Sequence, residues 1–305
     1  MSLHKLDLLE VPDTAHLFTP LRHELLALLR ALGADKWDAP TVAGAWRVRD
    51  VAAHLLDGEL RTLAAHRDGH ALADGGSVQG YADVVGLVQR LNGEGVTAGR
   101  HWSARLLTDL LEVTGAWMSD FVATLDPDAP ALFAVAWAGE AESTNRFDTA
   151  REYTERWHHQ MQIRLAAGDL GQPSVLLAER WARPLLDTAV RVLPHAFRST
   201  TVADGEAIEL TVSSESRDDG VGSRRRLSGF DSPWRRVWSL LRENGTWRLY
   251  AGAVGTAAAR VRGDPDAWWR LFFNAVPSEE ASRAFEVEGD HTLVSPLWRA
   301  RSVMV

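Results

Sequence analysis

The chain has 305 residues, of which 46% are hydrophobic and 24% are charged, as in globular proteins, and it is long enough for two domains. A formal net charge of −8 argues against nucleic-acid binding as its main role, and no apolar run approaches the about 20 residues that span a membrane. Cysteine is absent, which excludes disulfides, thiolate metal ligands and a protein thiol nucleophile. The first residues lack a basic stretch followed by an apolar one, so they predict no secretory signal and a cytoplasmic location.

The N-terminal half has the apolar spacing of helices. Leucines at positions such as 17, 21, 25, 28 and 32 recur on one helical face and stop at Gly33. Asp126-Pro127 and Gly168 mark the ends of two later helices. The pattern predicts helices over residues 14–32, 47–67, 81–91, 102–125 and 149–167. We therefore expect a bundle of about four helices, in which ligand sites are built from inward-facing side chains.

The pattern changes between residues 168 and 175, where Gly168, Gly171 and Pro173 lie. A helix over 175–193 is followed by strands predicted over 207–212, 225–228, 237–242, 247–251 and 256–261. Asn244-Gly245 predicts a hairpin turn, and Asp264-Pro265 begins a helix that runs through 273. We predict an α+β fold, with a helical domain over 1–170 and a smaller α+β domain over 175–305.

Three side chains in the helical half have the chemistry of metal ligands. Glu155 and His159 are four residues apart and lie on one helical face, and His54 is on another predicted helix. Three nitrogen and oxygen ligands with one position left open are typical of a catalytic divalent ion. His158 points about 100° away around the helix, where it can pair with Glu155. The spacing alone leaves a plainer alternative, a solvated Glu–His pair and a core or capping histidine at position 54.

The residues around these candidates carry a family resemblance. Trp-x-Val-x-Asp-x-x-x-His-Leu, beginning at Trp46, and Glu-x-Trp-x-His-Gln-x-x-Ile-Arg, beginning at Glu155, resemble the mycothiol-dependent maleylpyruvate isomerase family. That family is a branch of the DinB-like metal-binding helical bundles. The segments Trp247-Arg248-Leu249, 257–264 and 287–290 resemble its small C-terminal domain. The resemblance implies a DinB-like four-helix bundle and a divalent metal, most often Zn²⁺, bound by His54, Glu155 and His159.

The resemblance also implies a reaction class. Mycothiol, the low-molecular-weight thiol of actinobacteria, would be the cosubstrate of an isomerase or a thiol S-transferase acting on a small electrophile. A composition rich in arginine, alanine and glycine, with only two lysines, is compatible with an actinobacterial source. The partners expected are therefore a small-molecule thiol and its electrophile, with no nucleic acid and no membrane, for a monomer or a homodimer.

Carboxylate groups of such substrates would need arginine, which binds carboxylates through two hydrogen bonds. Arg242, Arg248 and Arg260 lie on the predicted C-terminal strands and are the candidates for a pocket that we expect between the two domains. Two alternatives remain open. The chain is either a non-catalytic DinB-like metal-binding protein, or a metal-dependent hydrolase in which the open position holds an activated water.

Overall fold

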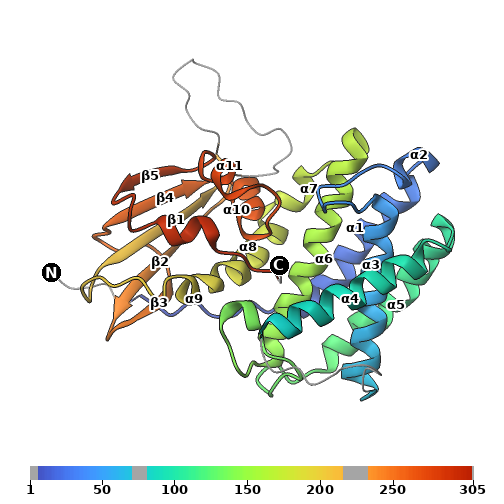
Figure 1. Ribbon diagram of the computed structural model, residues 1–305, viewed down its shortest axis with the longest axis horizontal. Coiled ribbons are helices and arrows are strands. Elements are labelled where there is room, and N and C mark those ends of the chain that lie inside the picture. The colour runs from blue at the N-terminus through green and yellow to red at the C-terminus, as the bar shows by residue number, and fades with distance from the viewer. Residues whose placement is uncertain (1–5, 71–80, 216–232, 304–305) are drawn as a thin grey trace. The chain divides into compact units, whose positions relative to one another are not determined.

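A computed structural model describes residues 6–70, 81–215 and 233–303 of the chain (Figure 1). These residues form two compact units. The helical unit takes the described parts of Asp13–Ala136 and Ala141–Pro173, and the sheet unit those of Met1–Pro12, Trp137–Glu140 and Ser174–Met304. Helices combined with a five-stranded mixed sheet confirm the predicted α+β class. In the described residues no helix is both long and apolar enough to cross a membrane. The strand predicted over 225–228 lies outside the described residues.

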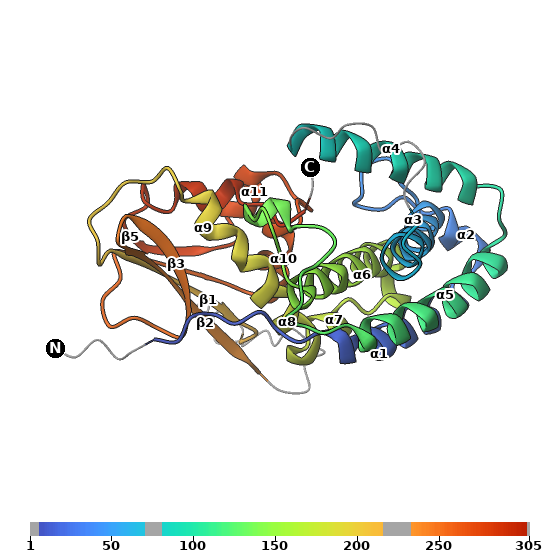
Figure 2. The ribbon, with the colours of Figure 1, turned by 90° about the horizontal axis from the view of Figure 1, so that it is seen from below.

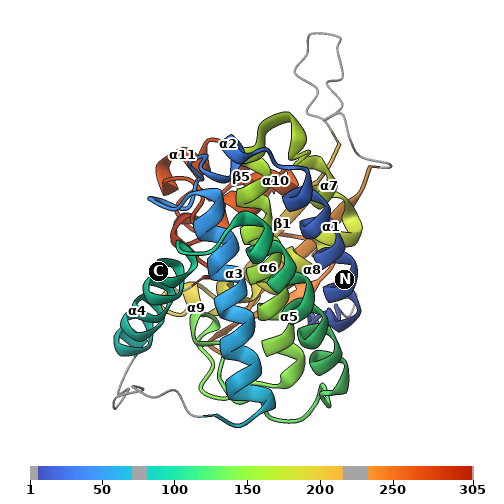
Figure 3. The same ribbon diagram turned by 90° about the vertical axis from the view of Figure 1, so that its right-hand side faces the viewer.

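Four helices form the bundle of the helical unit. They are α1 (Phe18–Ala31), α3 (Val48–Thr62), α5 (Ala104–Thr124) and α6 (Asn145–Ala167). Helices α1 and α3 each contact both α5 and α6, as Figure 3 shows. The apolar faces that the sequence predicted meet in a core that includes Leu25, Leu29, Val51, Leu111 and Ile163. Burial of such side chains stabilises a bundle by about 1.5–3 kcal/mol each.

Capping side chains fix where the bundle helices begin and end. The Ser103 hydroxyl accepts a hydrogen bond from Leu106 N at the start of α5, and the Thr144 hydroxyl does the same for Phe147 N at the start of α6. The Asp50 carboxylate accepts from Arg47 N in the first turn of α3. Helix α6 ends at Gly168, whose φ of 67° suits glycine.

One helix is longer than predicted. The prediction ended it at residue 91, whereas α4 (Tyr81–Gly99) continues through Gly93, Gly95 and Gly99 and packs on α3. Glycine lowers helix propensity, and for that reason the prediction stopped early. A Cβ atom at Gly95 or Gly99 would overlap a side chain of α3, so the glycines allow the two helices to approach closely.

Short elements complete the helical unit. They are η1 (Ala15–Leu17), α2 (Ala34–Trp37), the π-helical turn η2 (Leu63–Arg67) that continues α3, and η4 (Gly168–Leu170). The helix predicted over 175–193 in the sheet unit is interrupted, because Ala178 is extended. It is replaced by α7 (Ser174–Leu177), α8 (Glu179–Ala189), η5 (Val190–Val192) and α9 (Leu193–Ala196).

The sheet has the strand order β3-β2-β1-β4-β5. Its strands are β1 (Ala207–Ser213), β2 (Arg235–Glu243), β3 (Thr246–Ala251), β4 (Ala259–Gly263) and β5 (Glu286–Gly289). Strands β1 and β4 are parallel and the other neighbours are antiparallel. Asn244 and Gly245 both have positive φ in the β2–β3 hairpin, as the sequence predicted.

Helices cover one face of the sheet within this unit (Figure 2). Trp238 Nε1 donates a 2.6 Å hydrogen bond to Asp187 Oδ1 on α8, and Trp268 Nε1 on α10 (Pro265–Phe272) donates to Thr211 O. The unit also contains η3 (Ala136–Ala138, split with the helical unit), α11 (Ser278–Ser282) and η6 (Ser295–Arg299). Strand β5 was not predicted, because most of its side chains are exposed and its residues show no apolar alternation.

Candidate metal centre

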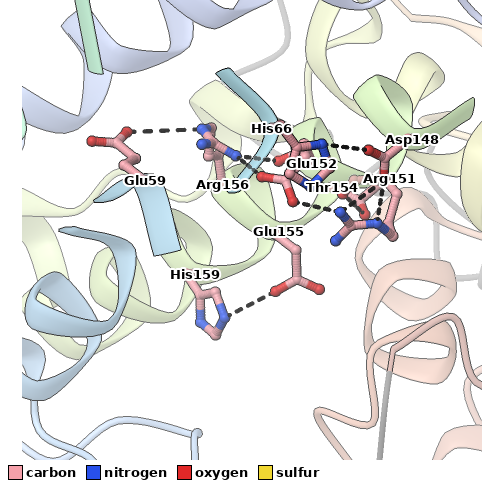
Figure 4. Close-up of polar contacts among 9 residues, drawn as sticks. All are labelled: Glu59, His66, Asp148, Arg151, Glu152, Thr154, Glu155, Arg156 and His159. Atoms are coloured by element: carbon pink, nitrogen blue, oxygen red, sulfur yellow. Dashed lines mark hydrogen bonds and ion pairs between the residues drawn. The ribbon is translucent and has the colours of Figure 1, made fainter. Parts of the chain in front are cut away.

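Helix α6 places Glu155 and His159 on one face, one turn apart. Glu155 Oε2 lies 3.3 Å from His159 Nε2, and Figure 4 shows the two side chains converging. The side chain of His159 is 10% exposed and that of Glu155 is 33% exposed. Because one helix supplies both groups, their separation is set by helix geometry and costs little further chain entropy.

Helix α3 brings His54 to the same place. The ring centroids of His54 and His159 lie 4.4 Å apart. His54, Glu155 and His159 each offer one ligand atom, and these atoms all lie within 4.8 Å of one another. Among the described residues this is the cluster of histidine and acidic groups with the spacing of a metal site. The structure therefore brings together the three residues that the sequence analysis selected.

The surroundings of His54 keep its ring neutral. Burial, followed by the nearby His159, lowers the pKa of His54 well below its usual value. The ring of Trp46 lies 5.0 Å from that of His54 between centroids. His54 Nδ1 is buried and has no hydrogen-bond partner among the described residues. A neutral imidazole is the form that binds metals, so its state suits a ligand.

The donor set fits a divalent ion. Two imidazole nitrogens and one carboxylate oxygen are ligands that zinc accepts in catalytic sites, where three protein ligands leave a position for water or substrate. A buried nitrogen without a partner is costly in a protein interior, and His54 Nδ1 is such an atom in one of the three candidate ligands. The side chain of Glu155 is more exposed than that of His159, so solvent reaches the cluster beside its carboxylate.

His158 is oriented differently from His159, as their adjacent positions on a helix require. Its Nε2 atom lies 2.8 Å from Gln162 Nε2, and Gln162 Oε1 lies 2.8 Å from His159 Nδ1. Burial, and then the neighbouring His159 and His54, lowers the pKa of His158 well below its usual value. The spacing in the sequence suggests a pair between His158 and Glu155, whereas in the structure His158 Nε2 pairs with Gln162. A glutamine three residues after a ligand histidine is the signal that could have identified it.

A second polar group on α6 was also missed by sequence reasoning. Glu152 accepts 2.6 Å hydrogen bonds from both Arg151 and Arg156, and Arg151 also contacts Asp148 at 2.8 Å (Figure 4). Burial raises the pKa of Glu152, but the two arginines outweigh burial and hold this pKa at about 2. These charges neutralise one another inside the unit and fix the rotamers of the turn that precedes Glu155.

The network reaches α3 through Glu59. Arg156 Nε lies 3.8 Å from Glu59 Oε1, and the Thr114 hydroxyl donates a 2.6 Å hydrogen bond to Glu59 Oε2. Burial raises the pKa of Glu59, although Arg156 opposes this shift. The network thus joins the helix that carries His54 to the helix that carries Glu155 and His159. It helps to hold the three ligands in register.

The three candidate arginines lie in the sheet unit. Arg248 and Arg260 share one face of the sheet, where Arg248 Nε is 4.0 Å from Glu243 and Arg260 Nε is 3.8 Å from Glu209. Arg242 lies on the opposite face, with its guanidinium 5.9 Å from the ring centre of Trp247. Arg242 Nε is buried and has no hydrogen-bond partner among the described residues. A role for any of them in substrate binding stays a prediction.

Comparison with known proteins supports the sequence resemblance. Residues 18–164 match the family described as the mycothiol maleylpyruvate isomerase N-terminal domain. The helical unit belongs to this family. The matched range contains all three candidate ligands and confirms the resemblance drawn from the motifs at Trp46 and Glu155.

Solved structures of the mycothiol-dependent maleylpyruvate isomerase align with most of the chain. A crystal structure of that enzyme aligns with a TM-score of 0.49 and 12% identity, covering 92% of this chain and 93% of the other. A histidine-to-alanine mutant of a mycothiol-dependent maleylpyruvate isomerase aligns with a TM-score of 0.47, the same identity and the same coverage. No curated protein matches the sequence significantly.

Proposed function

We propose that this protein is a divalent-metal-dependent enzyme that uses mycothiol, or a related low-molecular-weight thiol. With this thiol it would either isomerise a small electrophile or transfer the thiol sulfur to it. The observation that carries the proposal is the cluster of His54, Glu155 and His159, within 4.8 Å of one another, inside a domain of the maleylpyruvate isomerase family. The metal we propose is Zn²⁺, because two nitrogens and one oxygen suit it.

The chain needs a thiol from outside, because it has no cysteine. A divalent ion bound by the three residues would supply Lewis-acid chemistry that lowers the pKa of that thiol toward neutral pH. His54 and His159 would act as neutral ligands, and Glu155 would contribute the one negative charge among them. The ring of Trp46 lies beside both histidines, 5.0 Å from that of His54 and 6.3 Å from that of His159 between centroids.

The reaction of a family isomerase gives the proposal its chemical form. The thiolate sulfur forms a bond to one carbon of a conjugated carbon–carbon double bond, and the electron pair moves to the conjugated carbonyl oxygen. Rotation about the resulting single bond changes the geometry. Return of the electron pair restores the double bond, breaks the carbon–sulfur bond and regenerates the thiolate. A transferase would instead protonate the adduct and release it with the carbon–sulfur bond intact.

Thiol-dependent turnover tests this function. We expect conversion of maleylpyruvate, or of another conjugated carboxylic acid, that requires both mycothiol and stoichiometric metal and is lost in chelator-treated protein. His54→Ala should lack this activity, whereas His101→Ala, at an exposed histidine, should keep it. Turnover that is unaffected by metal removal would refute the proposal. Hydrolysis without thiol would favour the hydrolase alternative, and metal binding without any turnover would favour a non-catalytic protein.

A further inference from the structure

Three polar side chains on α6 form a buried hydrogen-bonded row behind the cluster. His159 Nδ1 lies 2.8 Å from Gln162 Oε1, and Gln162 Nε2 lies 2.8 Å from His158 Nε2. All three residues are buried: His159 is 8% exposed, Gln162 is 4% exposed and His158 is 5% exposed. Water therefore competes little for these bonds, and a hydrogen bond in such surroundings is strong and costly to leave unmade.

The chemistry of the amide gives the row a direction. An amide oxygen only accepts hydrogen bonds, so His159 Nδ1 must carry a proton. A neutral imidazole protonated at Nδ1 has its lone pair at Nε2, and His159 Nε2 is the atom 3.3 Å from Glu155 Oε2. The amide therefore selects the tautomer whose lone pair faces the cluster.

His158 sets the orientation of the same amide. An amide nitrogen only donates hydrogen bonds, so His158 Nε2 must accept and carries no proton. If the amide rotated by 180°, its N–H groups would face His159 Nδ1 and would favour the other tautomer. With His158 Nε2 unprotonated, that rotation would present the amide oxygen to a nitrogen lone pair, so the tautomer of His158 and the direction of the amide are coupled.

From this geometry we propose that Gln162 is a positioning residue that holds His159 in the tautomer presenting Nε2 to the metal, and that His158 fixes the direction of the Gln162 amide. The inference rests on the metal site of the proposed function. It adds roles for two residues, Gln162 and His158, that are not themselves ligands. Outer partners of a ligand histidine are often carboxylates or carbonyls. A neutral amide here orients the ring without adding a second negative charge to Glu155.

Histidine tautomers can be read directly in the metal-free protein. Long-range ¹H–¹⁵N correlation spectra of protein labelled with ¹⁵N-histidine distinguish Nδ1–H from Nε2–H, and spectra of single histidine variants assign the signals. We expect His159 to be protonated at Nδ1 in the wild type, and to populate the Nε2–H tautomer in Gln162→Met. Gln162→Glu, which keeps an acceptor oxygen, should restore Nδ1–H.

Zinc competition with a chromophoric chelator gives the second readout. Gln162→Met should weaken zinc binding about 10- to 100-fold, the usual effect of losing such a partner, and Gln162→Glu should recover the affinity. Gln160→Met is the matched control, because it removes a neighbouring buried amide, 1% exposed, on the same helix. His158→Leu leaves Gln162 in place, and we expect mixed His159 tautomers with a smaller loss of affinity. Urea unfolding of each metal-free variant separates these effects from a loss of stability.

An Nε2–H tautomer of His159 in the wild type would overturn the proposal. The proposal would also be wrong if Gln162→Met left both the His159 tautomer and the zinc affinity unchanged. If Gln162→Met does not fold, the same result in His158→Leu would overturn it. If His159 has the Nδ1–H tautomer and the wild type still binds no zinc, the proposed metal function fails while the hydrogen-bond assignment stands.

Discussion

His54 on α3 and His159 on α6 face each other with their ring centroids 4.4 Å apart and their planes inclined at 72°. The two residues come from helices that are distant in sequence and adjacent in the bundle. This edge-to-face arrangement of the two imidazole rings beside the Glu155 carboxylate lets each ring direct a nitrogen toward one point.

The first prediction concerns the ligands. His54→Ala and His159→Ala should each abolish stoichiometric metal in elemental analysis, because two remaining ligands hold a divalent ion poorly. His158→Ala should keep one metal per chain, although with a lower affinity, since it removes an orienting group only. Full metal content in His159→Ala would sink the ligand assignment.

The second prediction concerns the buried charge network. Glu152→Gln should lower the free energy of unfolding at pH 7 by about 3 kcal/mol, because it leaves two arginines with a missing partner. Glu112→Gln is the control, since it removes one side of the exposed ion pair with Arg30 and should change that energy by at most about 1 kcal/mol. Urea unfolding at fixed pH measures both.

The pH dependence of this loss has a defined sign. The pKa of Glu152 is about 2 in the folded protein and ordinarily 4.5, so its contribution is complete above pH 4.5 and is lost as the pH falls toward 2. The difference in unfolding free energy between wild type and Glu152→Gln should therefore shrink over this interval. A difference that stays constant from pH 7 to the acid limit would show that Glu152 is not paired as described.

The third prediction tests the close packing of α4 on α3. Gly99→Ala should lower the free energy of unfolding by about 1–3 kcal/mol, because the new Cβ would overlap Ala53. A Cβ atom at Gly93 would have no atom within 4 Å, so Gly93→Ala should raise the free energy of unfolding by about 0.5–1 kcal/mol through helix propensity. If both substitutions stabilise the protein, the two helices are farther apart than described.

The fourth prediction concerns the arginines of the sheet unit. At least one of Arg242→Gln, Arg248→Gln and Arg260→Gln should raise the KM for the thiol or lower kcat without changing metal content. The reason is that an anionic cosubstrate needs a guanidinium to bind its carboxylate. Arg105→Gln, at an exposed position of α5, is the control. Wild-type kinetics in all three variants would remove these residues from the reaction.

Local signals explain how much of the fold could be predicted. Leucine spacing, Gly168 and the Asn244-Gly245 turn each report on neighbours in sequence, and the corresponding helices and hairpin are present. The length of α4 was underestimated because the benefit of Gly95 and Gly99 depends on α3, which no local pattern reveals. The parallel pairing of β1 with β4 was not predicted for the same reason.

In the candidate site, too, the residues with a local sequence signal were predicted and those that depend on tertiary contacts were not. Glu155 and His159 were selected by spacing on one helix, and His54 by the family motif, and the structure brings all three together. Gln162 and the network around Glu152 were missed, because polar residues on a helix suggest a solvated face, whereas here Gln162 is buried and the side chain of Glu152 is only 13% exposed. The bound metal itself and the substrate-binding arginine stay predictions.

The chain passes between its two units at several points, and this bears on ancestry. Within the described residues the passages follow Pro12, Ala136, Glu140 and Pro173. A module attached by one linker can be gained or lost in a single recombination event. Here a single event would separate a short segment, such as Trp137–Glu140, from the unit to which it belongs. The two units are therefore expected to be inherited together, so that gene trees built separately from each should have the same branching order.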